Sequence, residues 1–342
     1  MTKLFYAGTS VGHQAVIVFF ALSGFLVGGQ AIERMISNKW SWKDYLIRRL
    51  TRLWIVLLPA ILATLLLDGL GNVLTGGVGY DGSFGGIYPS WPNASQPLDH
   101  SIPTILGNIF SLQTIVTPVL GSNGPLWSLA NEFWYYLIFP LLASVFFVPM
   151  RPTLILLSCI LLGILLIALP LEVLKGGLIW MLGAGAAFVT RRTGDHRFWK
   201  SWLVRLSIAA FVLVSIVLSE ISWAGVGDLL LGLAVVIALP VLAGIESPGA
   251  IYTRIGRSLS EISFTLYVTH FPLLTFLVMV GLAPVRRSPG VDSFLIFGIL
   301  ISVAVLFSVL LWQCFERHTD RVFSILISKL SSSLPLAKTV NE

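Results

Sequence analysis

The stretch GPLWSLANEFWYYLIFPLL, residues 124–142, places a carboxylate inside an apolar segment. Glu132 lies about 9 Å beyond the Gly-Pro boundary if the segment is helical. A charged side chain at such a depth in a membrane costs a few kcal/mol, so it usually faces a protein interior or a wet cavity. Glu132 is therefore either a packing carboxylate bonded to a neighbouring helix, or a group that orients a catalytic base or binds a polar substrate.

Helical spacing places further polar groups beside this carboxylate. Residues three and four apart share a helical face, so Ser128, Glu132, Tyr135 and Tyr136 form one polar stripe on an apolar helix. We take Glu132 as a catalytic candidate. The candidate substrate-binding residues on the same segment are Trp127, Ser128 and Asn131.

A second group of candidate residues is basic. In DYLIRRLTRLWIVLLP, Arg49 and Arg52 are three apart and Arg48 and Arg52 are four apart, at the start of an apolar run. Such arginines commonly form a cytoplasmic collar that fixes membrane topology. Guanidinium groups also bind phosphates through paired hydrogen bonds, so the same cluster could hold a phosphate-bearing donor.

Two further stretches combine polar and small residues within apolar runs. In SLSEISFTLYVTHFPLL, Ser263, Tyr267 and His270 share a helical face. His270 is then either a proton acceptor or a core residue bonded to a nearby carbonyl. In GHQAVIVFFALSGFLVGG, small residues from Ser23 to Gly29 let another helix or a ligand approach the backbone closely. Ser23 is also counted among the candidate substrate-binding residues.

The composition is that of a membrane protein. The chain of 342 residues is 56 % hydrophobic and only 11 % charged, whereas soluble domains carry about 25 % charged residues. The two cysteines do not indicate a disulfide framework. His, Cys and acidic residues do not cluster at metal-ligand spacing, so no metal site is predicted.

The long apolar runs predict an all-α, polytopic helix bundle with nine membrane spans. Residues 1–325 are predicted to form a single integral-membrane domain, followed by a cytoplasmic tail over 326–342. The predicted spans are 12–32, 50–70, 126–148, 153–171, 174–190, 202–219, 224–245, 262–283 and 293–315.

The distribution of basic residues gives this bundle an orientation. With the N-terminus outside and the C-terminus inside, all but four of the 22 Lys and Arg residues fall on the cytoplasmic side. The net charge of +6 is then explained by topology and requires no nucleic acid. The connection over 71–124 carries no Lys or Arg, so it is predicted to be external. Within it, IPTILGNIFSLQTIV is predicted to include a short interfacial helix.

Taken in order, five stretches resemble the landmarks of a known family, the acyltransferase-3 family of integral membrane O-acyltransferases. They are VIVFFALSGFLVGG, RRLTRLWIVLLP, GPLWSLANEFWYYLIFPLL, ISFTLYVTHFPLL and WQCFERHTDRVF. The resemblance runs from about residue 12 to residue 325. It implies an enzyme of the bacterial inner membrane that moves an acyl group, commonly acetyl, from cytoplasmic acyl-CoA to a saccharide such as lipopolysaccharide or exopolysaccharide.

The resemblance also assigns roles to residues. It matches Arg49 and Arg52 to the family's paired arginines and Glu132 to its W-S-L-x-x-E element. Tyr267 and His270 resemble the pattern of a late span, which makes both catalytic candidates. The family's first helix, with an Arg and the His thought to act as base, would precede Met1. Ten spans are expected for the family, so we expect the chain to be N-terminally short. Otherwise His270 could take the role of the base, or the protein is inactive unless a partner supplies the first helix.

Two other functions are compatible with the same features. A polytopic transporter or flippase of glycans or acylated substrates would also use an intramembrane carboxylate, although two similar halves are not visible in the sequence. An inactive, shortened acyltransferase homologue would keep the fold without the chemistry. No permanently bound cofactor is expected, and acyl-CoA would be a co-substrate.

Overall fold

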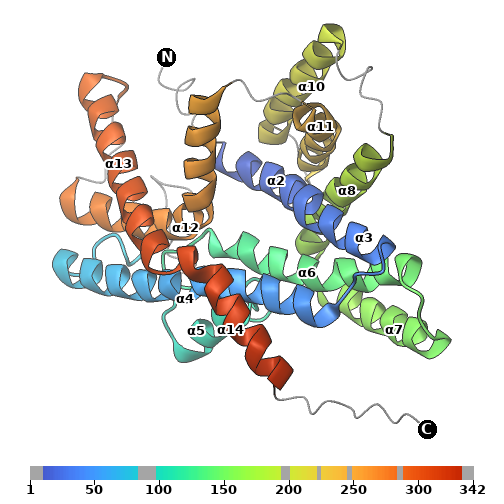
Figure 1. Ribbon diagram of the computed structural model, residues 1–342. Helices are drawn as coiled ribbons and strands as arrows, with labels where there is room; N and C mark the ends of the chain where they lie inside the picture. The colour runs from blue at the N-terminus through green and yellow to red at the C-terminus, as the bar shows by residue number, and fades with distance from the viewer. Residues whose placement is uncertain are drawn as a thin grey trace. The chain divides into compact units, whose positions relative to one another are not determined.

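The computed structural model describes residues 11–83, 98–193, 201–221, 225–244, 249–282 and 288–332 (Figure 1). These residues form helices joined by turns, with isolated β-bridges in the loops and no strand among them. The predicted all-α class is therefore confirmed. The elements are α2 (Gly12–Ser23), η1 (Gly24–Gly28), α3 (Gly29–Ile36), α4 (Trp42–Thr75), α5 (Ile102–Ile109), α6 (Leu126–Phe147), α7 (Pro152–Ala168), α8 (Leu171–Thr193), α10 (Trp202–Ile221), α11 (Val226–Ala243), α12 (Ala250–Gly281), α13 (Val291–Cys314), η2 (Glu316–His318) and α14 (Thr319–Ser332).

Eight helical segments among the described residues are long and apolar enough to span a membrane. The first combines α2, the π-helical turn η1 and α3 over Gly12–Ile36, and the last runs from Val291 to Leu330 through α13, η2 and α14. The predicted segment 153–171 forms α7, which has 17 residues. At 1.5 Å per residue α7 is about 25 Å long, a little less than the hydrocarbon core of a bilayer.

The chain divides into two units. Unit 1 consists of Met1–Trp40 and Ser128–Arg254, and unit 2 consists of Ser41–Trp127 and Ile255–Glu342. Each unit is thus assembled from two stretches that are distant in sequence. In unit 1, α8 packs against α2, η1 and α3, and α11 packs against α2, α8 and α10. In unit 2, α4 packs against α5 and α14.

Local sequence signals fix the start of two helices in unit 2. The Ser41 hydroxyl accepts a hydrogen bond from the Asp44 amide at 3.2 Å and caps the start of α4. Ser101 caps α5 in the same way through the Thr104 amide. Each cap satisfies one of the amides that a helix leaves unbonded at its first turn. Helix α5 falls inside the segment predicted to contain a short helix.

Asp99 adds an anion immediately before α5. Its carboxylate accepts a hydrogen bond from the Thr104 hydroxyl at 2.6 Å and another from the Ser101 amide at 2.7 Å. The Thr104 hydroxyl, followed by the Ser101 groups, lowers the pKa of Asp99 below its usual value. The carboxylate therefore remains ionised at neutral pH, and its negative charge at a helix N-terminus is favourable.

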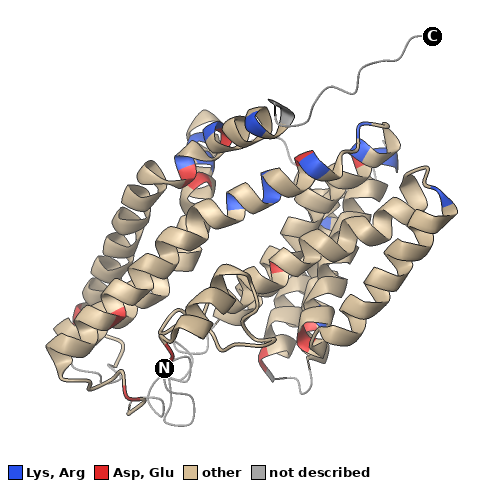
Figure 2. Ribbon diagram, turned by 90° about the horizontal axis from the view of Figure 1, so that it is seen from below, with Lys and Arg blue, Asp and Glu red and all other residues tan. Residues whose placement is uncertain are grey.

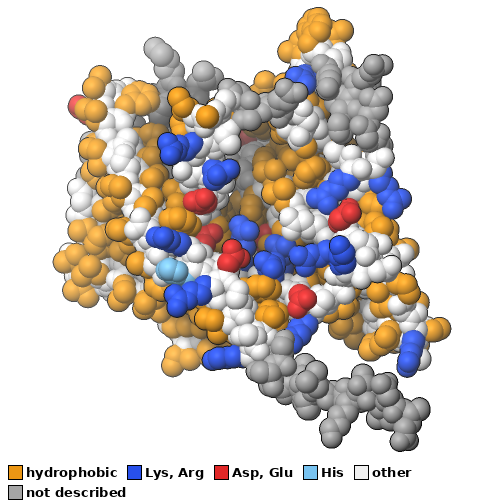
Figure 3. Space-filling view, in the orientation of Figure 1, with side chains coloured by type: hydrophobic (Ala, Val, Ile, Leu, Met, Phe, Trp, Pro, Cys, Tyr) orange, Lys and Arg blue, Asp and Glu red, His pale blue; other side chains and the backbone are white. Residues whose placement is uncertain are grey.

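The surface is that expected of lipid-facing helices. Leu206, Leu213 and Val217 of α10 are about 60 % exposed, as are Leu295 and Leu306 of α13. Apolar side chains cover much of the surface visible in Figure 3. Soluble proteins rarely expose apolar areas this extensive, so these helices are placed in the membrane.

Lys and Arg residues gather near particular helix ends (Figure 2). In α4 they occupy the N-terminal part, where Lys43, Arg48, Arg49 and Arg52 lie, and the remainder of the helix has none. In α8, Arg191 and Arg192 lie in the last turn. The positive-inside rule predicts a cytoplasmic position for both helix ends.

Candidate functional site

In unit 1, the side chain of Glu132 on α6 is held by hydrogen bonds from two hydroxyl groups. Its side chain is only 4 % exposed. Its Oε1 atom accepts a hydrogen bond from Ser23 Oγ at 2.6 Å and another from the Tyr136 hydroxyl at 2.5 Å. One donor comes from the next turn of the same helix and the other from α2. The carboxylate is therefore held in a single orientation from two directions.

Trp180 extends this polar contact into α8. Its indole Nε1 donates to Ser23 Oγ at 3.1 Å, so Ser23 accepts from Trp180 and donates to Glu132. The Trp180 ring is fully buried and packs edge-on against Phe139 and Tyr136, with ring centroids 4.9 and 6.4 Å away. Rigid aromatic packing thereby positions the hydroxyl that bonds the carboxylate.

The π-helical turn η1 begins directly after Ser23. A Cβ atom added at Gly24 would overlap the Trp180 carbonyl oxygen, so a glycine is needed for α8 to pack this closely. The predicted close approach at these small residues is thus present in the structure. A π-turn inside an α-helix is uncommon and frequently marks a functional site.

The residues of the polar stripe predicted on α6 do not share one partner. Ser128 and Asn131 are buried on the same helix as Glu132. The Tyr135 hydroxyl donates to the Val173 carbonyl oxygen at 2.8 Å and not to Glu132. Trp127 is half-buried and is the last residue of the first stretch of unit 2.

Replacing Ser23 by alanine tests this contact. The variant removes one hydrogen bond to Glu132 and leaves the buried Trp180 N–H without its partner, which costs roughly 1–3 kcal/mol. We expect the acyl-transfer activity that the family resemblance implies to fall about 10-fold or more, with the protein still present in the membrane. The measurement is turnover in purified membranes normalised to protein amount. The matched control is Ser144→Ala, because within the described part of the chain the buried Ser144 hydroxyl bonds only to Leu141 of its own helix. An equal loss in both variants would contradict the assignment.

Unit 2 contains the three predicted donor-binding arginines, and the C-terminal segment supplies acidic partners for two of them. Arg48 Nη1 lies 3.8 Å from the Asp320 carboxylate, and its guanidinium lies 4.0 Å above the Phe323 ring. Arg52 interacts electrostatically with Glu316, whose carboxylate accepts a hydrogen bond from the Thr265 hydroxyl at 2.5 Å.

The three arginines differ in exposure. Arg49 is 9 % exposed, Arg48 is half-buried and Arg52 is exposed. Of the three, the exposed Arg52 side chain has the least steric hindrance toward a ligand. Glu316 and Asp320, which balance the charge of this cluster, were not identified as site residues from sequence, although both lie in the WQCFERHTDRVF motif.

Tyr267 and His270 also lie in unit 2, on α12. His270 Nδ1 lies 3.0 Å from the Leu266 carbonyl oxygen and 2.8 Å from that of Tyr267, both on its own helix. The Tyr267 hydroxyl donates to the Pro125 carbonyl oxygen at 3.4 Å. Nδ1–H is thus the donor, and the lone pair of a neutral imidazole resides on Nε2.

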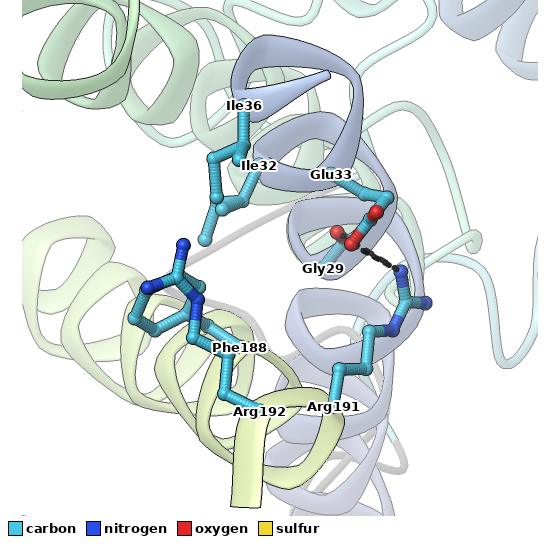
Figure 4. Close-up of a pocket in the computed structure, with 7 residues that line it drawn as sticks. All are labelled: Gly29, Ile32, Glu33, Ile36, Phe188, Arg191 and Arg192. Carbon is cyan, nitrogen blue, oxygen red and sulfur yellow. Dashed lines mark hydrogen bonds and ion pairs between the residues drawn. The ribbon is translucent and has the colours of Figure 1, made fainter.

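A pocket of about 220 Å³ lies in unit 1 between α3 and α8 (Figure 4). Arg191 Nη1 lies 3.7 Å from the Glu33 carboxylate, and the Arg192 guanidinium lies 4.6 Å from the Phe188 ring centroid. The other lining residues are Gly29, Ile32 and Ile36. Pockets for drug-sized ligands have volumes of about 300–1,000 Å³, so this one suits a single polar group. Groups of three or more His, Cys, Asp or Glu at metal-binding distance do not occur among the described residues.

The fold and the Glu132 site define a polytopic helical membrane protein with a carboxylate fixed inside a span. The sequence matches the acyltransferase domain family over residues 2–313, nearly the whole chain, so the protein belongs to the acyltransferase-3 family. An uncharacterized protein of Haemophilus influenzae is 30 % identical over 125 residues, which cover 36 % of this chain and 46 % of that protein. The match therefore spans less than half of that relative. No solved structure matches the sequence significantly.

Proposed function

We propose that this membrane acyltransferase moves an acyl group, in the first instance acetyl, from cytoplasmic acyl-CoA to a hydroxyl of an extracytoplasmic or lipid-linked saccharide. The observation that carries the proposal is the Glu132 carboxylate, buried inside a span and bonded to Ser23 and Tyr136. Family membership supports the acyl-transfer chemistry. The bacterial inner membrane with a cytoplasmic C-terminus is the location that fits a cytoplasmic donor and the basic-residue distribution.

On the acceptor side, the reaction needs a group that positions the attacking hydroxyl and a base that takes its proton. Glu132 is an acceptor for hydroxyl hydrogens, as its bonds to Ser23 and Tyr136 show. A sugar hydroxyl offers the same donor. We assign Glu132 the role of orienting the base or the acceptor hydroxyl, with Ser128 and Asn131 lining the same helix.

On the donor side, the pyrophosphate of acyl-CoA requires cations. Arg48, Arg49 and Arg52 are three guanidiniums within five residues of one helix, at the end predicted to be cytoplasmic. Guanidiniums suit phosphate oxygens because each offers two parallel N–H donors. Glu316 and Asp320 hold the cluster in place while no donor is bound.

The function is tested with the purified protein in liposomes, acetyl-CoA carrying a labelled acetyl group, and lipid-linked or free saccharide fractions from the source cell envelope. Acyl transfer predicts label bound to saccharide that is released by mild base as acetate, because the new bond is an ester. Transport of labelled saccharide without incorporation of acetyl would identify a transporter and overturn the proposal.

Arg52→Ala tests the donor site. Loss of one charge-assisted hydrogen bond to phosphate costs roughly 1.5–3 kcal/mol, so we expect the KM for acyl-CoA to rise about 10-fold or more with kcat nearly unchanged. Steady-state kinetics at saturating acceptor measures both. Lys43→Ala is the matched control, since Lys43 is a cation on the same helix outside the cluster. An unchanged donor KM in Arg52→Ala would remove Arg52 from the donor site.

A further inference from the structure

The pocket between α3 and α8 lies where two helical segments that run in the same direction both end. A Cβ atom at Gly24 would overlap the Trp180 carbonyl oxygen. Further along, a Cβ atom at Gly29 would overlap that of Ala187. The contacts therefore advance along both segments together, which makes the segments parallel. The pocket begins at Gly29 and is lined by the C-terminal parts of α3 and α8.

The length of α8 gives the depth of this pocket in a membrane. The helix has 23 residues. At 1.5 Å per residue, Arg191 and Arg192 in its last turn lie about 30 Å from its start, which is close to the thickness of the hydrocarbon core of a bilayer. The pocket therefore lies at the level of the phospholipid headgroups, on the side predicted to be cytoplasmic.

The charged groups that line the pocket leave one positive charge. Arg191 Nη1 lies 3.7 Å from the Glu33 carboxylate and donates to the Gly29 carbonyl oxygen at 3.5 Å. The Arg192 guanidinium lies over the Phe188 ring and has no carboxylate partner among the described residues. Two guanidiniums and one carboxylate make the pocket a place for a ligand with a single negative charge.

The shape of the pocket suits a phosphate group. Both arginine side chains extend from the end of α8 toward α3 (Figure 4). Because the flat face of the Arg192 guanidinium covers Phe188, its N–H groups are available to an acceptor beside the ring. Guanidinium N–H groups bind phosphate oxygens in pairs. The volume of about 220 Å³ accommodates one such group.

An apolar stripe on the outer face of α8 leads to Arg192. It consists of Leu178, Leu182, Gly185 and Val189, and Arg192 follows at the same spacing of three or four residues, so all five share one helical face. The three larger apolar side chains are exposed. A Cβ atom at Gly185 would meet no atom within 4 Å, so the surface there is open. The stripe can therefore be covered by an acyl chain whose headgroup reaches Arg192.

We propose that this pocket binds the phosphate of an anionic phospholipid of the cytoplasmic leaflet, with Arg192 as its main contact and an acyl chain along the α8 stripe. The lipid phosphodiester carries the single negative charge that the pocket balances. A soluble phosphate ester offers the same phosphate chemistry but has no acyl chain for the stripe. A zwitterionic headgroup would add an ammonium group, and Glu33 already pairs with Arg191. Basic pockets between membrane helices on the cytoplasmic side bind anionic headgroups. The inference does not depend on the proposed acyl transfer.

The experiment measures the thermal unfolding midpoint of the full chain in an uncharged detergent as dioctanoyl phosphatidylglycerol is added. Binding to the folded protein raises the midpoint with lipid concentration, which gives an apparent Kd. Arg192→Gln removes charge-assisted hydrogen bonds to the phosphate, so we expect the apparent Kd to rise about 10-fold or more. Arg151→Gln is the matched control, because Arg151 is an exposed arginine of unit 1 that precedes α7 and does not line the pocket. Its apparent Kd should match that of wild type.

Two further probes distinguish the sources of the phosphate. Dioctanoyl phosphatidylcholine has the same chains with a zwitterionic headgroup, and glycerol phosphate has the phosphate without chains. We expect neither to raise the midpoint at concentrations at which phosphatidylglycerol does. An equal shift with phosphatidylcholine would show that the headgroup charge is not recognised, and an equal shift with glycerol phosphate would assign the pocket to a soluble ester. Either result overturns the proposal, as does an Arg192→Gln variant that keeps the wild-type Kd.

Discussion

Glu132→Gln is expected to abolish acyl transfer while the protein remains folded in the membrane. Glutamine has the same shape, and its Oε1 still accepts from Ser23 and Tyr136, which donate at 2.6 and 2.5 Å in the wild type. The packing around α6 is therefore retained. The second carboxylate oxygen is replaced by an N–H₂ donor, which cannot accept a hydroxyl hydrogen or orient a protonated base.

The expected size of this effect follows from the role. A positioned acid–base or orienting group typically contributes 10²–10⁴ in rate, so kcat should fall about 100-fold or more. The measurement is labelled-acetyl transfer normalised to the amount of folded protein from size-exclusion chromatography in detergent. Glu172→Gln is the control, because the Glu172 side chain is 79 % exposed and, among the residues that the structure describes, pairs only with Lys175 at 2.8 Å. Wild-type kcat in Glu132→Gln would show that the carboxylate serves packing alone.

The variant Glu132→Asp distinguishes the effect of the carboxylate's charge on activity from the effect of its position. Glu132→Asp keeps the carboxylate but shortens the side chain by about 1.5 Å, the length of one C–C bond. It cannot then stay bonded to Ser23 on α2 and Tyr136 on α6 together. We expect an activity loss similar to that of the glutamine variant, whereas a large recovery would indicate that charge matters more than position.

Much of the Glu132 site was predictable because it lies on regular helices. The segment predicted over 126–148 is α6, Leu126–Phe147, and the helical period correctly placed Tyr136 beside Glu132. Periodicity also placed Tyr135 on the same stripe, yet its hydroxyl bonds to Val173. A helical face is wide, so neighbouring positions on it meet different helices. Which helix each position meets is decided by tertiary packing, and a sequence pattern does not contain that information.

The partners of Glu132 and Asp68 were harder to predict. Trp180 lies 157 residues from Ser23, the hydroxyl it bonds. His100 Nε2 lies 2.9 Å from the buried Asp68 carboxylate, yet the two residues are 32 apart in sequence, across a Gly- and Pro-rich connection that has no period to fix its position. The signal that was available is Asp68 itself, an acidic residue in an apolar run. An intramembrane carboxylate is a functional candidate by default, and the same argument that selected Glu132 applies to Asp68.

The acidic partners of the arginine cluster were also not predictable from the sequence pattern. The spacing of Arg48, Arg49 and Arg52 correctly indicated a shared region of one helix, and the structure adds the acids that balance it. Glu316 and Asp320 belong to the last motif of the chain and follow the break of the helix at Phe315. Their approach to α4 depends on the change of direction after α13, which is a tertiary feature.

Gly24→Ala is expected to destabilise the whole of unit 1. The added Cβ would overlap the Trp180 carbonyl oxygen, which is backbone and cannot rotate away as a side chain would. Helices α2 and α8 would have to separate, and with them the hydrogen bond from Trp180 to Ser23. Overpacking a well-packed interior typically costs about 1–3 kcal/mol and more where backbone must move. A loss of this size lowers the melting temperature by several degrees, by roughly 2–4 °C per kcal/mol for a folding unit of about 150–250 residues.

The measurement is the midpoint of thermal unfolding in detergent together with the amount of protein recovered from membranes. Gly12→Ala is the matched control, because Gly12 begins α2 and a Cβ there meets no atom within 4 Å. That substitution should leave the midpoint unchanged or raise it, since alanine favours a helix over glycine. The two variants add the same methyl group to one continuous helical segment, so a difference between them reports the contact with α8. Because Ser23 precedes Gly24, the activity of Gly24→Ala should fall further than its folded fraction does. A midpoint and activity equal to wild type would mean that α8 packs less closely here, and that the hydrogen bond between Trp180 and Ser23 does not position Glu132.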